Sequence, residues 1–360
     1  MRIAVIAALL LIGLTTAPAS AQTAPADDLN RIVAEDDLAG GIAVVRTGTD
    51  LTRFAAGYSD VDTKAGFALN TYVRAASITK TFVAATVLQL VAEGRVDLDE
   101  PIEAYLPGRI CGEGIDAGAI TVRQLLRHQS GLPEYFDDET PPPVEPTTGD
   151  QLLDMALTRP AQFPPGTAMK YTNTNYIVAA LVIERVTGEP AVDEITRRTI
   201  APLGLSDTYF PAPGDTGLRP PFAHGYEVED GRRTDVTDFN ASAAGTAGGI
   251  VSTNEDMSAF ITALLDGRVV PRPQLDQMMQ TVPMPDGDGL LDYGLGLMKV
   301  NLPCGVTAWG HGGDIEGYHS FVAKPFGGPA VSMTFTQSPD ASSPASDPRG
   351  DVMSALYCRA

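Results

Sequence analysis

The string Ser77-Ile78-Thr79-Lys80 opens a strongly apolar helical pattern that ends at Gly94. We therefore expect a buried helix with a serine at its start. Residues three apart share a helix face, so the Ser77 hydroxyl and the Lys80 amine can meet in one pocket. The helix N-terminus favours a developing alkoxide, and burial disfavours a charged lysine. Such a pair can activate a serine nucleophile, although a capping serine beside a surface lysine would give the same string.

A second string, Tyr171-Thr172-Asn173, follows the turn signal Pro164-Pro165-Gly166. In an extended stretch, side chains two apart point the same way. A phenol near Lys80 could relay protons between Ser77 and a leaving group, while the Asn173 amide could hold a substrate carbonyl and the lysine. A packed aromatic side chain and a helix-capping asparagine are the alternative.

The third string, His311-Gly312-Gly313, lies between β-type segments. Glycines in a strand let a ligand backbone approach closely, so Gly312 and Gly313 are the predicted substrate strand. The N–H of Asp314 is placed to complete an oxyanion hole with the N–H of Ser77. A tight turn with an exposed His311 is the alternative. Two other histidines, His128 and His319, receive no catalytic role.

The composition limits the possible partners. The chain has 45 acidic residues against 25 lysines and arginines, for a net charge of −20. This excess disfavours a nucleic-acid partner, whose phosphates need a positive patch. The length of 360 residues exceeds one compact core, which indicates one large two-lobed unit or two interleaved domains. The sequence leaves the oligomeric state open.

The N-terminus has the pattern of an export signal. Arg2 precedes an apolar run from Ile3 to Leu14, and the small residues Ala19-Ser20-Ala21 precede Gln22. We expect cleavage after Ala21 and a mature chain of residues 22–360 in the periplasm or outside the cell. No later segment approaches the ~20 apolar residues of a membrane span.

Three cysteines, Cys111, Cys304 and Cys358, would meet an oxidising compartment. Three cysteines allow one disulfide and leave one free thiol, and their number does not show which two cysteines pair. Neither the cysteines nor the four histidines have zinc-site spacing, so we expect no metal and no cofactor.

Periodicity predicts strands near both ends of the chain and helices between them. The predicted strands are Gly41–Arg46, Leu51–Gly57, Tyr293–Val300, Val306–Trp309, Tyr318–Ala323 and Val331–Thr336. The predicted helices are Thr121–His128, Asp150–Thr158, Asn175–Val186, Met257–Leu265 and Arg349–Cys358, the fourth after a capping box at Ser252-Thr253-Asn254-Glu255.

This order indicates an α+β fold in which both termini build one antiparallel sheet around an inserted helical lobe. The sheet lobe takes about residues 28–75 and 290–360, and the helical lobe takes about residues 76–289. We expect the site in the cleft between the lobes.

Together the three strings resemble the serine β-lactamase and penicillin-recognising family, in its class C β-lactamase, DD-carboxypeptidase and esterase branch. The closest likeness is to secreted D-alanyl-D-alanine carboxypeptidases. Further stretches look like blocks of that family: Ala75–Lys80, Leu125–Leu132, Pro165–Tyr176, Ala247–Thr253 and Tyr293–Leu297.

The resemblance implies the same α+β fold and a covalent acyl-enzyme on Ser77. Lys80 and Tyr171 would share the general-base work, Asn173 would orient the substrate, and His311 would replace the lysine of the usual third motif. The resemblance also implies a disulfide between Cys304 and Cys358, which leaves Cys111 as the thiol.

Two departures concern the substrate. The family commonly has Thr or Ser where this chain has Gly312, and carboxypeptidases of this kind can have an arginine where it has Met298. Without a carboxylate clamp, one or two charge-assisted hydrogen bonds are lost. The substrate would be a small peptide, an ester or a β-lactam. We rank a D-Ala-D-Ala carboxypeptidase first, then an esterase or amidase, then a β-lactamase, then a non-catalytic penicillin-binding module.

Overall fold

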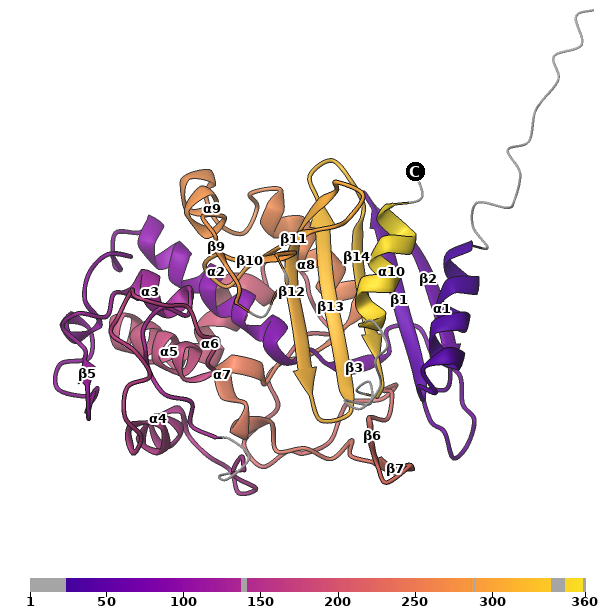
Figure 1. Ribbon diagram of the computed structural model, residues 1–360, viewed down its shortest axis with the longest axis horizontal. Coiled ribbons are helices and arrows are strands. Elements are labelled where there is room, and N and C mark those ends of the chain that lie inside the picture. Colours follow the sequence, from indigo (N-terminus) through magenta and orange to yellow (C-terminus); the bar gives the residue numbers. More distant parts are fainter. Residues whose placement is uncertain (1–23, 137–140, 286, 288, 338–346, 359–360) are drawn as a thin grey trace, which may run out of the picture.

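A computed structural model describes residues 24–136, 141–285, 287, 289–337 and 347–358. The predicted signal segment therefore lies outside the described residues. One eight-stranded antiparallel sheet has the strand order β2-β1-β14-β13-β12-β11-β10-β9 (Figure 1). Its strands are β1 Gly40–Thr47, β2 Asp50–Gly57, β9 Val282–Pro283, β10 Leu291–Tyr293, β11 Met298–Asn301, β12 Thr307–Ile315, β13 Tyr318–Pro325 and β14 Ala330–Phe335.

The two ends of the chain meet inside this sheet. The hairpin β1–β2 turns at Thr47 and Asp50, and β1 pairs with β14 in the register Gly41↔Phe335. Strands β1 and β14 are largely buried, so each side of the sheet needs a cover. The predicted fold class, an antiparallel sheet completed by both termini, is confirmed.

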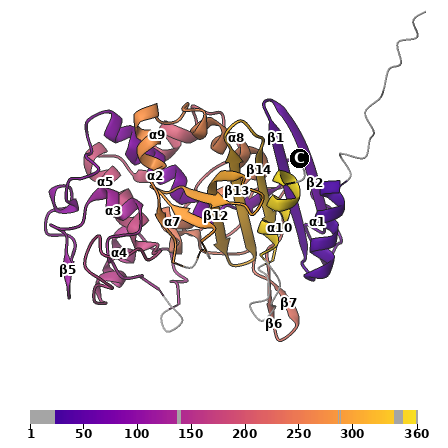
Figure 2. The ribbon, with the colours of Figure 1, turned by 45° about the horizontal axis from the view of Figure 1, so that its top comes forward.

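Helices cover both faces of the sheet. The helices α1 (Ala24–Glu35) and α10 (Pro348–Tyr357) pack together on one face, and α8 (Asn254–Leu265) packs on the other face against β14, β13 and β1 (Figures 1 and 2). Although α8 comes from the middle of the chain, it belongs in space to the sheet.

The remaining helices form a lobe beside the sheet (Figure 1). They are α2 Thr79–Ala92, α3 Val122–Leu126, α4 Gly149–Leu157, α5 Thr174–Thr187, α6 Ala191–Ile195, α7 Gly245–Gly248 and α9 Arg272–Met278. Helix α5 is buried along most of its length and ends at Gly188, whose φ of 79° is left-handed. Three two-stranded ribbons complete the chain: β3 Tyr72–Arg74 with β8 Val251–Thr253, β4 Cys111–Gly112 with β5 Ile115–Asp116, and β6 Tyr226–Glu229 with β7 Arg232–Asp235.

Three local expectations need correction. The strand expected over Tyr293–Val300 is two strands, because Gly296 adopts a φ of 67° and turns the chain between them. The capping residue of α8 is Thr253, whose side chain accepts from the N–H of Asp256, so the cap lies one residue after the expected Ser252. The expected segment Val306–Trp309 extends as β12 through His311-Gly312-Gly313, which is strand rather than a connection.

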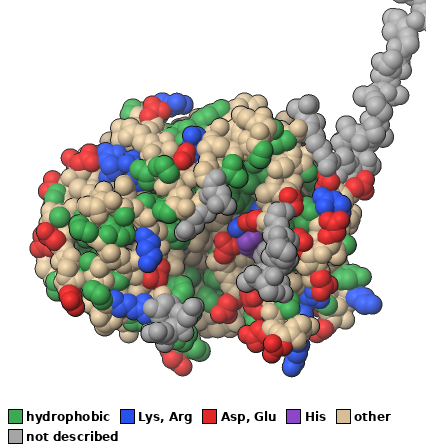
Figure 3. Space-filling model, in the orientation of Figure 1, with side chains coloured by type: hydrophobic (Ala, Val, Ile, Leu, Met, Phe, Trp, Pro, Cys, Tyr) green, Lys and Arg blue, Asp and Glu red, His purple; other side chains and the backbone are tan. Residues whose placement is uncertain are grey.

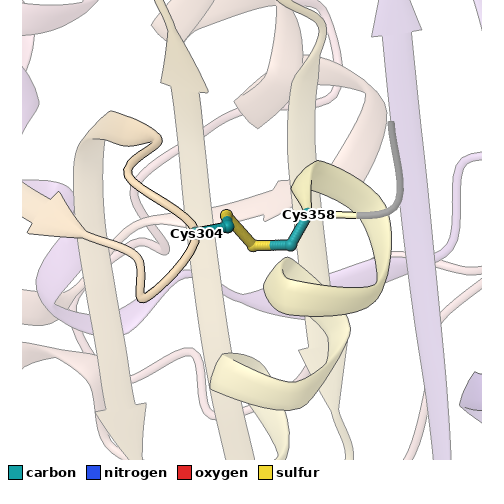
Figure 4. The surroundings of a disulfide bond; sticks show 2 residues. All are labelled: Cys304 and Cys358. Carbon is teal, nitrogen blue, oxygen red and sulfur yellow. A yellow bond between two sulfur atoms is a disulfide. The ribbon is translucent and has the colours of Figure 1, made fainter.

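A disulfide joins Cys304, in the loop between β11 and β12, to Cys358 at the end of α10 (Figure 4). It fastens the last helix to the sheet. Cys111 is exposed and carries no disulfide. Among the described residues, we find no helix with the length and apolar character needed to cross a membrane.

Candidate active site

A strained turn presents Ser77. The preceding residue, Ala76, is buried and has a φ of 49°, a conformation that residues with a Cβ rarely adopt. Ser77 lies in the short 3₁₀ turn Ala76–Ile78, and α2 begins only at Thr79. The expected helix therefore starts two residues after the serine. The turn points the Ser77 side chain into a pocket at the junction of the two lobes.

Lys80 is fully buried, and its amine reaches three oxygens. Nζ lies 3.0 Å from Ser77 Oγ, 2.7 Å from Asn173 Oδ1 and 2.8 Å from the carbonyl oxygen of Ala247. Burial lowers the pKa of Lys80 to about 7, although the charges of Glu134 and Asp314 oppose this shift. A neutral amine has two hydrogens, which the Asn173 and Ala247 oxygens accept. Its lone pair is then left for the Ser77 proton, which is the arrangement a general base needs.

Tyr171 completes this group. Its ring centroid lies 4.8 Å from Lys80 Nζ, and Ser77 interacts with its phenol and lowers the pKa of that phenol, against the larger effect of burial. Burial raises the pKa of Tyr171 well above its ordinary value of 10. The phenol is therefore protonated at neutral pH, so it can donate a proton to a leaving group while Lys80 acts as the base.

Asn173 is held by a residue that the sequence did not single out. Its N–H donates to Glu134 Oε2 over 2.6 Å, and the N–H of Tyr135 donates to Oε1 over 2.9 Å. Burial raises the pKa of the Glu134 carboxyl, against the effect of these two bonds. Glu134 is 39 residues from Asn173, so no local pattern could have revealed the contact.

Strand β12 approaches the Ser77 turn very closely. A Cβ on Gly313 would lie 2.2 Å from the carbonyl oxygen of Ala75 and 3.2 Å from the Cβ of Ala76. Only glycine allows this approach. It brings the next residue, Asp314, beside Ser77, as an oxyanion hole made from their two N–H groups requires.

His311 lies on the same strand and is uncharged. The carbonyl oxygen of Gly312 lies 2.6 Å from Nδ1 and can only accept, so Nδ1 carries the proton. Nε2 then accepts from the Tyr293 hydroxyl over 2.8 Å. Burial lowers the pKa of His311 to about 3. His311 therefore lines the site as a neutral ring, whereas the lysine implied by the resemblance would bring a charge.

An ion cluster borders the pocket where α10 begins. The Arg349 guanidinium donates to Asp314 over 3.1 Å, to Asp347 over 2.8 Å and to the carbonyl oxygen of Ser320 over 3.1 Å. His319 bridges the same two carboxylates. No sequence pattern singled out Arg349. Asp347 is its neighbour in the chain, but Asp314 and Ser320 lie on other elements and only the fold brings them to the guanidinium.

The pocket itself has a volume of about 1060 Å³. Figure 3 shows a hollow near the middle of the face seen in Figure 1, with acidic side chains beside it. Its apolar wall comes from the sheet, α10 and the segment before β10: Met284, Leu290, Leu291, Met298, Val300, Leu302, Phe321 and Met353. Arg349 is the one basic residue among the described residues that line it, against Asp314, Glu316, Asp347 and Asp351. Within the described part of the chain, no group of three or more His, Cys, Asp or Glu is arranged to hold a metal ion.

Known proteins resemble this chain over nearly its whole length. The solved D-stereospecific amidohydrolase from Streptomyces sp. has a TM-score of 0.85 and 35% identity, over 94% of this chain and 99% of that one. The D-amino acid amidase from Ochrobactrum anthropi SV3 gives 0.82 and 29%, with the same coverage.

A curated relative, the D-aminopeptidase of Gluconobacter oxydans strain 621H, is 29% identical over 288 residues, which are 78% of this chain. The match spans 52%, about half, of the length of that relative. The family model described as Beta-lactamase matches residues 27–352. With that match and the grouping of Ser77, Lys80 and Tyr171, the chain belongs to the Beta-lactamase family of serine hydrolases.

Proposed function

We propose that the protein is an amidase or aminopeptidase that acts on D-amino acid amides or short peptides with a free amino group. The reaction forms an acyl-enzyme. Lys80 takes the proton of Ser77 as Oγ attacks the carbonyl carbon, and the carbonyl becomes an oxyanion held by the N–H groups of Ser77 and Asp314. Tyr171 gives a proton to the departing amine as the amide bond breaks, and the proton held by Lys80 restores the phenol. Water then attacks the ester on Ser77, and one of its protons returns to the Ser77 oxygen as the acid is released.

The charge of the pocket carries this proposal. Among the described lining residues there are four carboxylates and one arginine, which is already paired with two of them, Asp314 and Asp347. Lys80 is buried, and His311 is neutral. A substrate carboxylate would therefore meet no unpaired cation among the described lining residues, whereas a substrate ammonium would meet favourable charge. This favours an amine-bearing amide over the C-terminal carboxylate of a carboxypeptidase substrate.

The relatives support the same choice. The printed names of three similar proteins are D-aminopeptidase, D-stereospecific amidohydrolase and D-amino acid amidase. The apolar wall of the pocket suits a substrate with an apolar side chain.

Matched substrates test the proposal. D-phenylalanine amide should be hydrolysed faster than its N-acetyl derivative, its L-enantiomer and N-acetyl-D-alanyl-D-alanine, and Ser77→Ala should abolish turnover. Release of D-alanine from N-acetyl-D-alanyl-D-alanine, which has a carboxylate but no free amine, as the fastest reaction would instead establish the carboxypeptidase. Preference for the acetylated amide would identify an amidase that needs no free amine, and turnover of an ethyl ester without turnover of any amide would identify the esterase of this fold. Rapid turnover of a penicillin would identify a β-lactamase, and a penicillin bound without turnover of any substrate would identify a binding module.

We further propose that the protein is exported. The N-terminal pattern supports this, and so does the Cys304–Cys358 disulfide, because disulfides persist in oxidising compartments. Fractionation of cells that express the full chain should place it outside the cytoplasm, with Gln22 as the first residue. An uncleaved chain in the cytoplasm would contradict the proposal.

A further inference from the structure

The buried residue His128 accepts two hydrogen bonds from the segment that carries Tyr171 and Asn173. The N–H of Lys170 donates to the His128 carbonyl oxygen over 3.0 Å, and the N–H of Thr172 donates to the His128 ring at Nδ1 over 3.2 Å. The two residues on either side of Tyr171 are thus both hydrogen-bonded to one histidine, whose side chain is completely buried.

The hydrogen bonds define the form of this imidazole. The N–H of Thr172 can only donate, so Nδ1 is an acceptor and the ring proton lies on Nε2. The side-chain amide of Asn175 lies 3.1 Å from the same Nδ1 and therefore donates through Nδ2, while its Oδ1 accepts from the Ser130 hydroxyl over 2.5 Å. The ring is neutral, in agreement with the low pKa that burial gives to His128.

Ring packing adds to the hydrogen bonds. The His128 ring lies 4.2 Å from the Tyr171 ring at an interplanar angle of 32°, and 4.7 Å from the Tyr293 ring. Tyr293 holds His311 through its hydroxyl. The His128 imidazole therefore contacts both the Tyr171 ring and the Tyr293 ring, and Tyr293 in turn is hydrogen-bonded to His311 on β12.

The backbone conformation of His128 is unfavourable for a residue with a Cβ. Its φ of 58° is left-handed, directly after the end of α3, where glycine or asparagine is usual. A histidine in this conformation is expected where its side chain is needed. We propose that His128 is a positioning residue, which holds Tyr171 against Ser77 and Asn173 against Lys80 by accepting the N–H of Thr172.

Variants of His128 separate this role from a general effect on stability. His128→Asn keeps an acceptor near the position of Nδ1 and tolerates the left-handed backbone, whereas His128→Leu fills similar space without an acceptor. The measured quantity is kcat/KM for an ethyl ester without an amino group, whose alkoxide leaving group needs the proton of Tyr171. It is measured well below the thermal midpoint of each variant. This readout depends only on the Ser77 chemistry, so its failure is distinct from failure of the proposed amine-bearing substrate.

The coupling to Tyr171 decides the outcome. His128→Leu should lower kcat/KM by up to ~100-fold through misplacement of the catalytic groups, mainly in kcat. His128→Asn should restore most of the loss. In a Tyr171→Phe background, His128→Leu should cost several-fold less than in the native protein, because one of the two groups that it positions has already lost its hydroxyl. Losses that multiply in the double variant, or a lower thermal midpoint with unchanged kcat/KM, would overturn the proposal.

Discussion

The Arg349 guanidinium occupies the space next to Gly312. A Cβ on Gly312 would lie 3.3 Å from Arg349 Nη1 and 3.2 Å from the Phe321 ring. Where related sequences commonly carry a hydroxyl, this chain thus has a cation from its last helix, already paired with Asp314 and Asp347. Glycine at position 312 leaves room for this guanidinium, and the pairing of Arg349 leaves no unpaired cation among the described residues that line the pocket.

The two adjacent glycines should respond differently to alanine. In Gly312→Ala the neighbours are side chains that can shift by a few tenths of an ångström, so we expect a loss of about 1 kcal/mol in the free energy of unfolding and activity close to that of the native protein. In Gly313→Ala the new Cβ meets the backbone carbonyl of Ala75, so β12 must move away from Ser77.

We expect Gly313→Ala to lower the rate of acylation by ~100-fold or more, as does loss of an oxyanion donor. The measurement is the second-order rate of Ser77 labelling by a fluorophosphonate. Equal rates for both variants would show that β12 does not need this close approach.

The reactivity of Ser77 should follow the protonation of Lys80. The pKa of Lys80 is about 7, and only the neutral amine can take the serine proton. The labelling rate should fall about tenfold per pH unit below that value and level off above it. His311 is neutral throughout this range and adds no second inflection.

Lys80→Arg serves as the control for this prediction. An arginine stays charged at all working pH values, so the variant should label slowly with no dependence on pH near 7. A native profile that rises only near pH 10 would show that burial does not activate Lys80.

His319 should stabilise the fold more in acid than in base. Burial opposes its charge, but Asp314 and Asp347 outweigh burial and raise the pKa of His319 above 6.5. A raised folded-state pKa gives stability that is fully present below about pH 6.5 and is lost as the pH rises through the folded-state value. His319→Gln should therefore lose more unfolding free energy at about pH 5.5 than at about pH 8.5.

The size of that difference follows from charged hydrogen bonds, at about 1.5–3 kcal/mol. Urea denaturation at both pH values measures it. An equal loss at the two values would mean that His319 is not charged in the folded protein.

The disulfide should stabilise the fold by linking α10 to the sheet. Cys304 and Cys358 are 54 residues apart, and closing a loop of this size contributes ~2–4 kcal/mol. The pair of serine substitutions at both positions should lower the thermal midpoint by several degrees. Cys111→Ser is the matched control and should leave the midpoint unchanged. A midpoint equally unaffected by both changes would show that α10 is held by packing alone.

The sequence alone was sufficient to predict the contacts between residues that are close in the chain and the strands that follow a regular apolar alternation. Ser77 and Lys80 lie on one turn of chain, so their proximity could be predicted, and Tyr171 and Asn173 lie two residues apart. The alternation of apolar residues near both ends predicted the sheet, although the turn at Gly296 and the length of β12 were missed. The turn at Gly296 packs against the helical lobe, where its N–H donates to the carbonyl oxygen of Leu126, and the length of β12 depends on its pairing with β13.

Only the tertiary structure decided which groups are charged and what supports them. The lowered pKa of Lys80 and the neutrality of His311 come from burial by distant segments. Glu134, His128 and Arg349 act on residues that are about 35 to 45 positions away in the chain. Local sequence carries no record of such contacts, because packing of the whole fold brings the partners together and removes the water that would otherwise screen them.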